Sequence, residues 1–193
     1  MNSKIKQQIK IPKKVENLLV KSGMKYELIE HRTVYTAFDK AATLKIKPGA
    51  IAKVLVVKAD RELAMAVIGG DRNLDMGKLL KLTKAKKIDF AKEKNIGETF
   101  KGIDPGAIPP FEKLWDLKIF CDKKLLESPK IILSAGSYET SIKITPAAFK
   151  KSNPDMISNN FSLVRKKSPK KAKIKKDKIG IKINKKTKSR KTV

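Results

Sequence analysis

The sequence predicts a single α+β domain, and three observations support that fold class. Two apolar runs, residues 50–57 and 63–68, are separated by a polar turn at 60–62, which is the pattern of a β-hairpin. Short helical patterns lie before and after this pair, without the regular alternation of strand and helix that a parallel sheet requires. A length of 193 residues fits one core domain with appendages, and we place the domain at residues 11–164.

Three elements are expected before the hairpin: a helix from Pro12 to Ser22, a strand at 26–30 and a short helix at 37–44. Ser22 is followed by Gly23, which is a typical helix end. Thr36 is a candidate N-cap for the second helix, because its hydroxyl can accept a hydrogen bond from a free amide of the first turn. We expect this helix to turn Phe38, Ala41 and Ala42 inward.

Seven elements are expected after the hairpin: a helix capped by Asn73 or Asp75, a strand at 87–90, a helix at 91–96, strands at 117–121, 130–133 and 140–144, and a helix that begins at Thr145-Pro146. Proline is favoured in the first turn of a helix, where its missing amide has no partner to lose. We expect residues 69–73 to form a tight polar loop. Residues 158–164 form either a final strand or a linker.

The charge of the chain is strongly basic and unevenly distributed. Lys and Arg total 46 against 19 Asp and Glu, a formal net charge of +27. Residues 165–193 carry fifteen Lys or Arg and one acidic residue, Asp177, which gives +14 in this segment alone. We expect residues 1–10 to be a flexible basic arm and residues 165–193 a disordered Lys-rich tail. Such an excess predicts a polyanionic partner, and charge alone does not separate nucleic acid from an anionic membrane.

Several classes of protein are disfavoured by what the sequence lacks. No apolar run approaches 18 residues, and the first ten residues lack the apolar core of a signal peptide. The chain has no phosphate-binding loop, dinucleotide fingerprint or nucleophile elbow. The single Cys121 excludes an internal disulfide and a cysteine-based zinc site. These features predict a cytoplasmic protein with no membrane partner.

One lysine interrupts the first apolar run of the hairpin. Lys53 precedes four residues, 54–57, that favour a strand covered on both faces. Its ammonium can reach water along the methylene stem, or it can point into a cleft and hold a ligand. The strand alone favours the first alternative, since most lysines lie on the surface.

Two loops and one histidine are further candidates. Residues 102–111 contain two Gly and three Pro and offer backbone amides at 106, 107 and 108, so the loop can cradle a polar group or serve as a rigid crossover. The small residues 134–137 allow a ligand to approach closely, or they simply form a turn. His31 is the only base available to a catalytic triad, although a structural hydrogen bond is the more usual role.

Taken in order, these segments resemble the YbaK/prolyl-tRNA synthetase-associated editing domain family. The resemblance runs from about Val15 to Lys150. Five short markers carry it: His31 to Ala37 with the helix that follows, Ala52 to Leu55, Gly70 to Asp75, Gly102 to Phe111 with a Gly-x-x-x-Pro element, and Ser134 to Gly136 followed by Ile142.

The resemblance implies a mixed, partly barrel-like sheet flanked by helices, and a metal-independent and cofactor-free activity. Members hydrolyse the ester between a wrong amino acid and the 3′ end of a tRNA, usually proline tRNA, and some do so beside prolyl-tRNA synthetase. The invariant lysine of the family falls on Lys53, which we expect to be the catalytic residue, as an anchor or an electrostatic group. We expect the substrate to be bound by residues of the two loops and by the histidine, namely Gly106, Ala107, Ile108, Pro110, Ser134, Ala135, Gly136 and His31.

The sequence departs from the family at two places. Val54 stands where some alanine-specific members have Asn, and Tyr138 stands near where some have His, so the sequence does not predict alanine specificity. We expect the tail lysines Lys166, Lys167, Lys170 and Lys171 to contact tRNA phosphates; the alternative is a solubilising extension. Two other interpretations of the whole chain compete with this one. The first is an editing-like module without activity, which binds tRNA or a synthetase. The second is a charge-binding scaffold for nucleic acid or a membrane surface.

Overall fold

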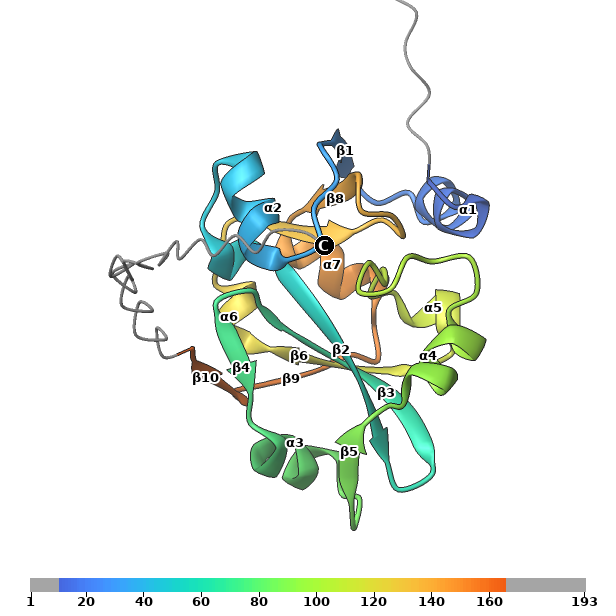
Figure 1. Cartoon of the computed structure of the whole chain (residues 1–193), viewed down its shortest axis with the longest axis vertical. Coiled ribbons are helices and arrows are strands. Elements are labelled where there is room, and N and C mark those ends of the chain that lie inside the picture. The colour runs from blue at the N-terminus through green and yellow to red at the C-terminus, as the bar shows by residue number, and fades with distance from the viewer. Residues whose placement is uncertain (1–10, 166–193) are drawn as a thin grey trace, which may run out of the picture.

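A computed structural model describes residues 11–165, which contain seven α-helices, one 3₁₀ turn and ten strands (Figure 1). The helical elements are α1 (Lys13–Lys21), α2 (Ala37–Leu44), η1 (Pro48–Ala50), α3 (Met76–Thr83), α4 (Glu93–Thr99), α5 (Glu112–Trp115), α6 (Lys123–Leu126) and α7 (Pro146–Ser152). The strands are β1 (Tyr26–Glu30), β2 (Ala52–Ala59), β3 (Glu62–Gly69), β4 (Arg72–Leu74), β5 (Ile88–Phe90), β6 (Lys118–Asp122), β7 (Ile131–Ser134), β8 (Thr140–Ile144), β9 (Ile157–Asn159) and β10 (Ser162–Val164). The predicted basic arm and the tail lysines Lys166, Lys167, Lys170 and Lys171 lie outside the described residues.

The strands form three sheets, and the largest is mixed. Its order is β5-β2-β3-β6-β9, with β2 and β3 paired as the predicted antiparallel hairpin and with β6 parallel to both of its neighbours. A second, antiparallel sheet has the order β1-β8-β7, and β4 pairs with β10. The α+β class with a mixed sheet is therefore confirmed. Within residues 11–165 the sheets do not close into a barrel.

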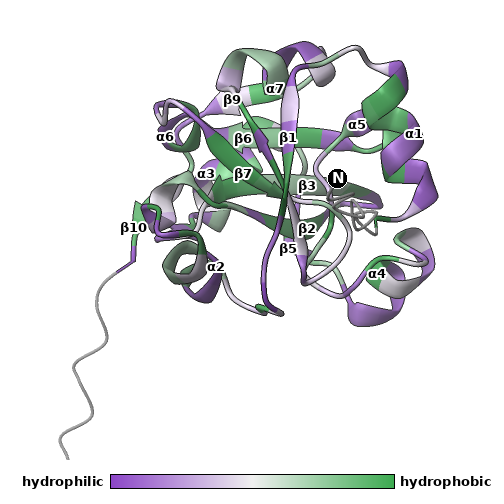
Figure 2. Cartoon of the chain, turned by 90° about the horizontal axis from the view of Figure 1, so that it is seen from above, coloured by the Kyte–Doolittle hydropathy of each residue, from purple (hydrophilic) through white to green (hydrophobic). Residues whose placement is uncertain are grey.

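The main core lies between the two larger sheets. Met65 and Val67 of β3 belong to one buried hydrophobic cluster with Leu133 and Ile142 of the smaller sheet and with Phe149 of α7. The alternate residues of β3 pack on the opposite face against α3, so this strand is covered on both sides, as its unbroken apolar run indicates. In Figure 2 the hydrophobic colour concentrates on β3, β6 and β7 in the middle of the molecule.

One part of the chain differs from the prediction, and another takes the strand form that was one of its two predicted alternatives, because residues distant in sequence pair with them. The segment 69–73, predicted as a loop, ends in β4, and residues 158–164 form parts of two strands, β9 and β10. Val164 pairs with Arg72, about ninety positions earlier in the chain. A pairing of this range leaves no trace in a local sequence pattern.

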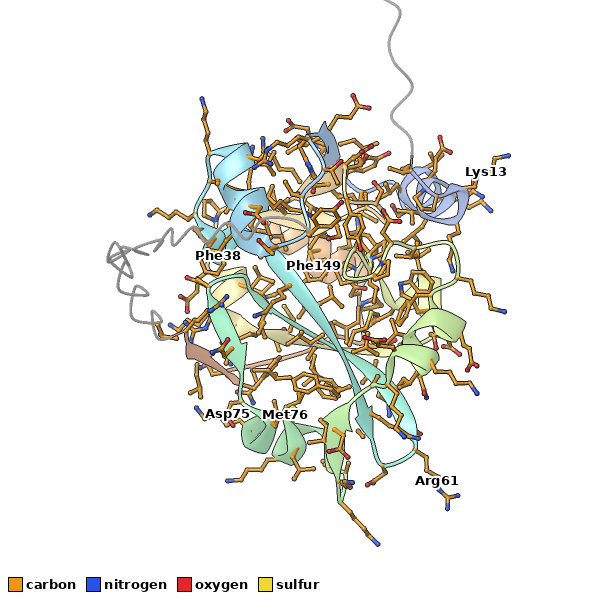
Figure 3. All side chains as sticks on the ribbon, in the orientation of Figure 1. Lys13, Phe38, Arg61, Asp75, Met76 and Phe149 are labelled. Carbon is orange, nitrogen blue, oxygen red and sulfur yellow. The ribbon has the colours of Figure 1, made fainter. Side chains whose placement is uncertain are left out.

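The inner face of α2 also differs from the prediction. Thr36 caps the helix as expected, and Ala41 is buried, but Phe38 is 42% exposed and Ala42 is exposed. The expected inward orientation of Phe38 and Ala42 is therefore wrong. Since α2 packs on Ile51 and Ile132 through Ala41, the position that turns inward beside it is Lys40. Figure 3 shows Phe38 at the α2 end of the molecule, away from Arg61 at the tip of the β2–β3 hairpin.

Candidate active site

A cavity of about 310 Å³ opens beside the start of β2. Its walls come from the N-terminal part of α2, the first half of β2, the turn at Gly106, the loop after β7 and Arg165. In Figure 1, α2 lies next to the end of β2 at which this cavity forms. The cavity therefore joins segments from both sheets and from the end of the described chain.

Four of the predicted site residues line this cavity: Lys53, Gly106, Ala107 and Ser134. The other five, which are His31, Ile108, Pro110, Ala135 and Gly136, are not part of its lining. Four of these five are buried behind the walls, and His31 is half-buried at the end of β1. The structure thus brings the lysine and parts of both predicted loops together, with the remaining residues in supporting positions.

Lys53 is held at one end of the cavity by a backbone hydrogen bond. Its Nζ donates to the carbonyl of Arg72 at 2.6 Å. Partial burial lowers the pKa of Lys53, the charge of Arg165 lowers it further, and Asp71 opposes both. A half-buried ammonium beside a second cation is well placed to attract an anionic or electron-rich group of a ligand.

The two predicted loops are hydrogen-bonded to each other. The amide of Gly136 donates to the carbonyl of Ala107 at 3.0 Å, and the amide of Asp104 donates to the carbonyl of Gly136 at 3.1 Å. Gly136 has φ +100°, and a Cβ there would come within 2.8 Å of Pro12, so only glycine fits without strain. Gly136 therefore supports the Gly106 turn from behind the wall of the cavity.

The Gly106 turn offers fewer free donors than its sequence indicates. Gly106 adopts φ +81°, which glycine allows at no steric cost. The amide of Ala107, one of the three expected to meet a ligand, donates within the turn to the carbonyl of Asp104 at 2.9 Å. The donors with which this turn can stabilise a negative charge on a ligand are therefore mainly its other backbone amides, those of Gly106 and Ile108.

His31 has a partner on each of its ring nitrogens. Nε2 lies 2.8 Å from Oγ of Ser141, and Nδ1 lies 2.9 Å from the carbonyl of Arg32. Burial lowers the pKa of His31, the hydrogen bond to Arg32 opposes that shift, and Lys40 lowers it again. This geometry fixes the ring at the end of β1, with its polar atoms already used inside the fold.

Lys40 is a lysine of the cavity that the sequence interpretation missed. It is only 7% exposed, and its Nζ donates to Oγ of Ser134 at 3.2 Å. Burial lowers the pKa of Lys40 to about 8. A helical-wheel reading centred on Ala37, Ala41 and Leu44 would have placed Lys40 on the inner face.

Two further findings concern the described residues as a whole. Within residues 11–165, no three His, Cys, Asp or Glu side chains lie close enough together to hold a metal ion. In the same part of the chain, no helix has both the length and the apolar character needed to span a bilayer. The metal-independent activity and the cytoplasmic location stay predictions.

The α+β fold with a mixed sheet agrees with the class of protein that the sequence resembles, the aminoacyl-tRNA editing domains. The family model of the aminoacyl-tRNA editing domain matches residues 31–152, which is more than half of the chain. The chain therefore belongs to the aminoacyl-tRNA editing domain family.

Relatives of this chain agree with the family assignment. The proline–tRNA ligase of Bacillus velezensis is 26% identical over 111 residues, which cover 58% of this chain and 19% of the ligase. The chain thus spans about a fifth of the length of that relative.

Solved structures show the same fold. The crystal structure of a candidate trans-editing enzyme for prolyl tRNA synthetase has a TM-score of 0.69 at 20% identity, covering 78% of this chain and 96% of that chain. The crystal structure of the hypothetical protein APE2540 has a TM-score of 0.71 at 21% identity, covering 78% of this chain and 99% of that one. At these identities the likeness concerns the fold alone.

Proposed function

We propose that this protein is an aminoacyl-tRNA deacylase that acts in trans on mischarged tRNA. The observation that carries the proposal is one cavity lined by Lys53, Gly106, Ala107 and Ser134, in a chain that belongs to the editing domain family. We further propose that the substrate is proline tRNA carrying a non-cognate small amino acid. The ligase relative and the likeness to a candidate trans-editing enzyme for prolyl tRNA synthetase support this choice, and make prolyl-tRNA synthetase a candidate partner.

The chemistry asked of the site is modest. Water attacks the carbonyl carbon of the aminoacyl ester, the bond from that carbon to the ribose oxygen breaks, and the products are a free amino acid and an uncharged tRNA. An ester is already activated, so positioning and electrostatic stabilisation of the oxyanion can supply most of the acceleration. Lys53 is suited to hold the terminal ribose or phosphate or to polarise the carbonyl, because its ammonium is fixed by Arg72 and half-buried.

A deacylation panel tests this proposal directly. Proline tRNA charged separately with alanine, cysteine, serine and proline is incubated with the full chain, and the loss of the labelled ester is followed over time. We expect at least one non-cognate ester to be hydrolysed well above the rate in buffer, with prolyl-tRNA spared. Failure to accelerate the loss of any of these esters would reject the deacylase function on proline tRNA.

An editing-like module that binds tRNA or a synthetase without hydrolysis is the alternative. The observation that favours it is the internal use of the Ala107 amide, which removes one donor from the Gly106 turn. A chain that retains charged tRNA on a filter but leaves its ester intact would support this alternative.

The basic tail is proposed to tether tRNA near the cavity. Arg165, the last described residue, lines the cavity, and its amide donates to the carbonyl of Asp71 at 3.1 Å. The chain therefore continues into residues 166–193 directly from the wall of the site. These 28 residues follow in the sequence with a large excess of lysine, which favours contacts with phosphates.

Replacing Lys166, Lys167, Lys170 and Lys171 together by Gln should weaken tRNA binding at low salt. Each lost phosphate contact reduces the magnitude of the slope of log affinity against log salt by a little under one unit, so the loss of four contacts should reduce it by up to roughly 3 to 4. Filter binding at several salt concentrations measures this, with four exposed lysines distant from the cavity changed to Gln as the control. Unchanged slope and affinity would leave the tail as a solubilising extension.

A further inference from the structure

Lys40 is a buried cation for which the described part of the chain provides no carboxylate. Among residues 11–165, the ion pairs involve other lysines and arginines, and the one hydrogen bond of the Lys40 ammonium goes to Ser134. Burying an ammonium without a counter-ion costs several kcal/mol, so such a group is retained where a ligand or a change of charge offsets the cost. Lys40 lines the cavity, where a ligand can reach it.

Two serines beside Lys40 have unused hydrogen-bonding capacity. Oγ of Ser134 accepts from Lys40, and within residues 11–165 its own hydroxyl makes no hydrogen bond as a donor. Ser137 is a lining residue of the same cavity, and its Oγ is buried and has no hydrogen-bond partner within the described chain. An orphaned hydroxyl in a cavity wall is costly in a protein interior and is typical of a position that a ligand completes.

The ammonium groups of Lys40 and Lys53 are bonded to different parts of the fold, although both residues line the cavity. The ammonium of Lys53 is bonded to Arg72 in β4, whereas that of Lys40 is bonded to Ser134 at the end of β7, in another sheet. The charge of Arg165, at the start of the basic tail, lowers the pKa of Lys53, whereas the charge of Lys40 lowers the pKa of His31. A ligand that contacts Lys53 and Arg165 in this cavity therefore has a second cation, Lys40, available to another of its groups.

We propose that Lys40, Ser134 and Ser137 form the subsite for the amino-acid side chain of the substrate, and that it takes a side chain with an acceptor oxygen in preference to an apolar one of equal size. This inference rests on the proposed deacylase function for the identity of the ligand. The free N–H groups of Lys40 and the free O–H of Ser134 are all donors, so the matching group must accept. Both a neutral hydroxyl and a carboxylate have this chemistry.

Discrimination by such a subsite is expected to be strong. A pocket of apolar walls separates side chains that differ by one group only weakly, whereas a pocket that hydrogen-bonds a polar group rejects the analogue that lacks it, because buried donors are then left unpaired. Of two side chains of equal size, the apolar one therefore binds more weakly, because it leaves the buried donors of the subsite unpaired.

Binding of stable substrate analogues tests the subsite without requiring hydrolysis. The probes are adenosines whose 3′ oxygen is replaced by an amide to serine, 2-aminobutyrate, aspartate or leucine, so that each oxygen-bearing side chain has an apolar match. Isothermal titration calorimetry of the full chain at pH 7 should give the oxygen-bearing member at least about tenfold tighter binding in one or both pairs. A preference only for serine identifies a hydroxyl, and a preference only for aspartate identifies a carboxylate.

Three variants locate the preference in the chain. Lys40→Met keeps a similar volume without the charge and should reduce the preference to less than about threefold, and Ser137→Ala should reduce it without removing the cation. Lys47→Met, which changes an exposed lysine shortly after α2, is the matched control and should leave the preference unchanged. Equal binding within both pairs, a preference that survives Lys40→Met, or no binding of any analogue would each overturn the subsite.

The pH dependence of the preference gives a second readout. Lys40 loses its proton near pH 8, so the preference for aspartate over leucine should fall between pH 7 and pH 9.5 in the unmodified chain and stay flat in Lys40→Met. The charged and titratable groups near Lys40 are His31, whose pKa is lowered by burial, and, elsewhere around the cavity, Tyr35, Lys53, Tyr138 and Arg165. Selective binding of the analogues without hydrolysis of charged tRNA would support the subsite and reject the deacylase function. Hydrolysis without selective binding would support the deacylase function and reject the subsite.

Discussion

Replacing Lys53 by Met is expected to lower kcat/KM for hydrolysis of the aminoacyl-tRNA ester by about 10²- to 10³-fold. This is the usual cost of removing one preorganised group that stabilises a developing oxyanion. The Lys53 ammonium is fixed by Arg72 at 2.6 Å, so it needs little reorganisation when charge develops in the substrate. Met retains most of the volume and apolar stem of the side chain. The loss is therefore a loss of charge and of its hydrogen bonds.

Single-turnover kinetics with the charged tRNA measure this loss and separate binding from chemistry. An effect mainly on KM assigns Lys53 to anchoring the 3′ end, and an equal fall in kcat and kcat/KM assigns it to the transition state. The matched control is Lys58→Met, which changes an exposed lysine on the same strand. Thermal unfolding of both variants checks that the fold is intact. Full activity in Lys53→Met would remove this residue from the mechanism while leaving the enzyme class intact.

The sequence predicted those parts of the fold and site that depend on local pattern. The hairpin of β2 and β3 followed from two apolar runs around a polar turn, and the caps of α2 and α7 followed from Thr36 and Thr145. Lys53 and the Gly106 turn were recognised because a known family places such residues in the same order. The cavity that unites them was not predictable from local pattern, because its walls come from both sheets.

What the sequence did not reveal depends on contacts between distant segments. Lys40 turns inward because α2 packs through Ala41 onto Ile51 and Ile132, which a wheel centred on Phe38 does not disclose. Arg165 reaches the cavity because β10 pairs with β4, and nothing in a Lys-rich tail indicates where its first residue is anchored. The orphaned hydroxyl of Ser137 is likewise a property of its surroundings, which the small-residue turn in the sequence does not specify.

Replacing Asp122 by Ala is expected to lower the free energy of unfolding by about 3–5 kcal/mol, which is the usual cost of breaking a buried network of charge-assisted hydrogen bonds. Asp122 is 0% exposed. One carboxylate oxygen accepts the amide of Phe161 at 2.8 Å and the other accepts the amide of Lys124 at 3.0 Å, while Nε of Arg72 lies 4.0 Å away. Alanine would leave the buried amide of Phe161 and the partly buried amide of Lys124 without acceptors, and the guanidinium of Arg72 without its neighbouring charge.

The substitution should also lower the activity of the site. Asp122 supports β4, and the Arg72 carbonyl in β4 accepts the hydrogen bond of Lys53. Arg72 bonds through its side chain to Ser162 of β10 and through its carbonyl to Lys53, so a displaced Arg72 shifts the hydrogen-bond acceptor that holds the Lys53 ammonium. Urea unfolding at pH 7 measures the stability, and kcat/KM at a temperature where the variant is folded measures the second effect. Glu127→Ala, which removes an exposed carboxylate paired with Lys124, is the control and should cost less than about 1 kcal/mol. If Asp122→Ala costs no more than this control, β4 is held by its pairing with β10 alone, and the proposed link from Asp122 to Lys53 fails.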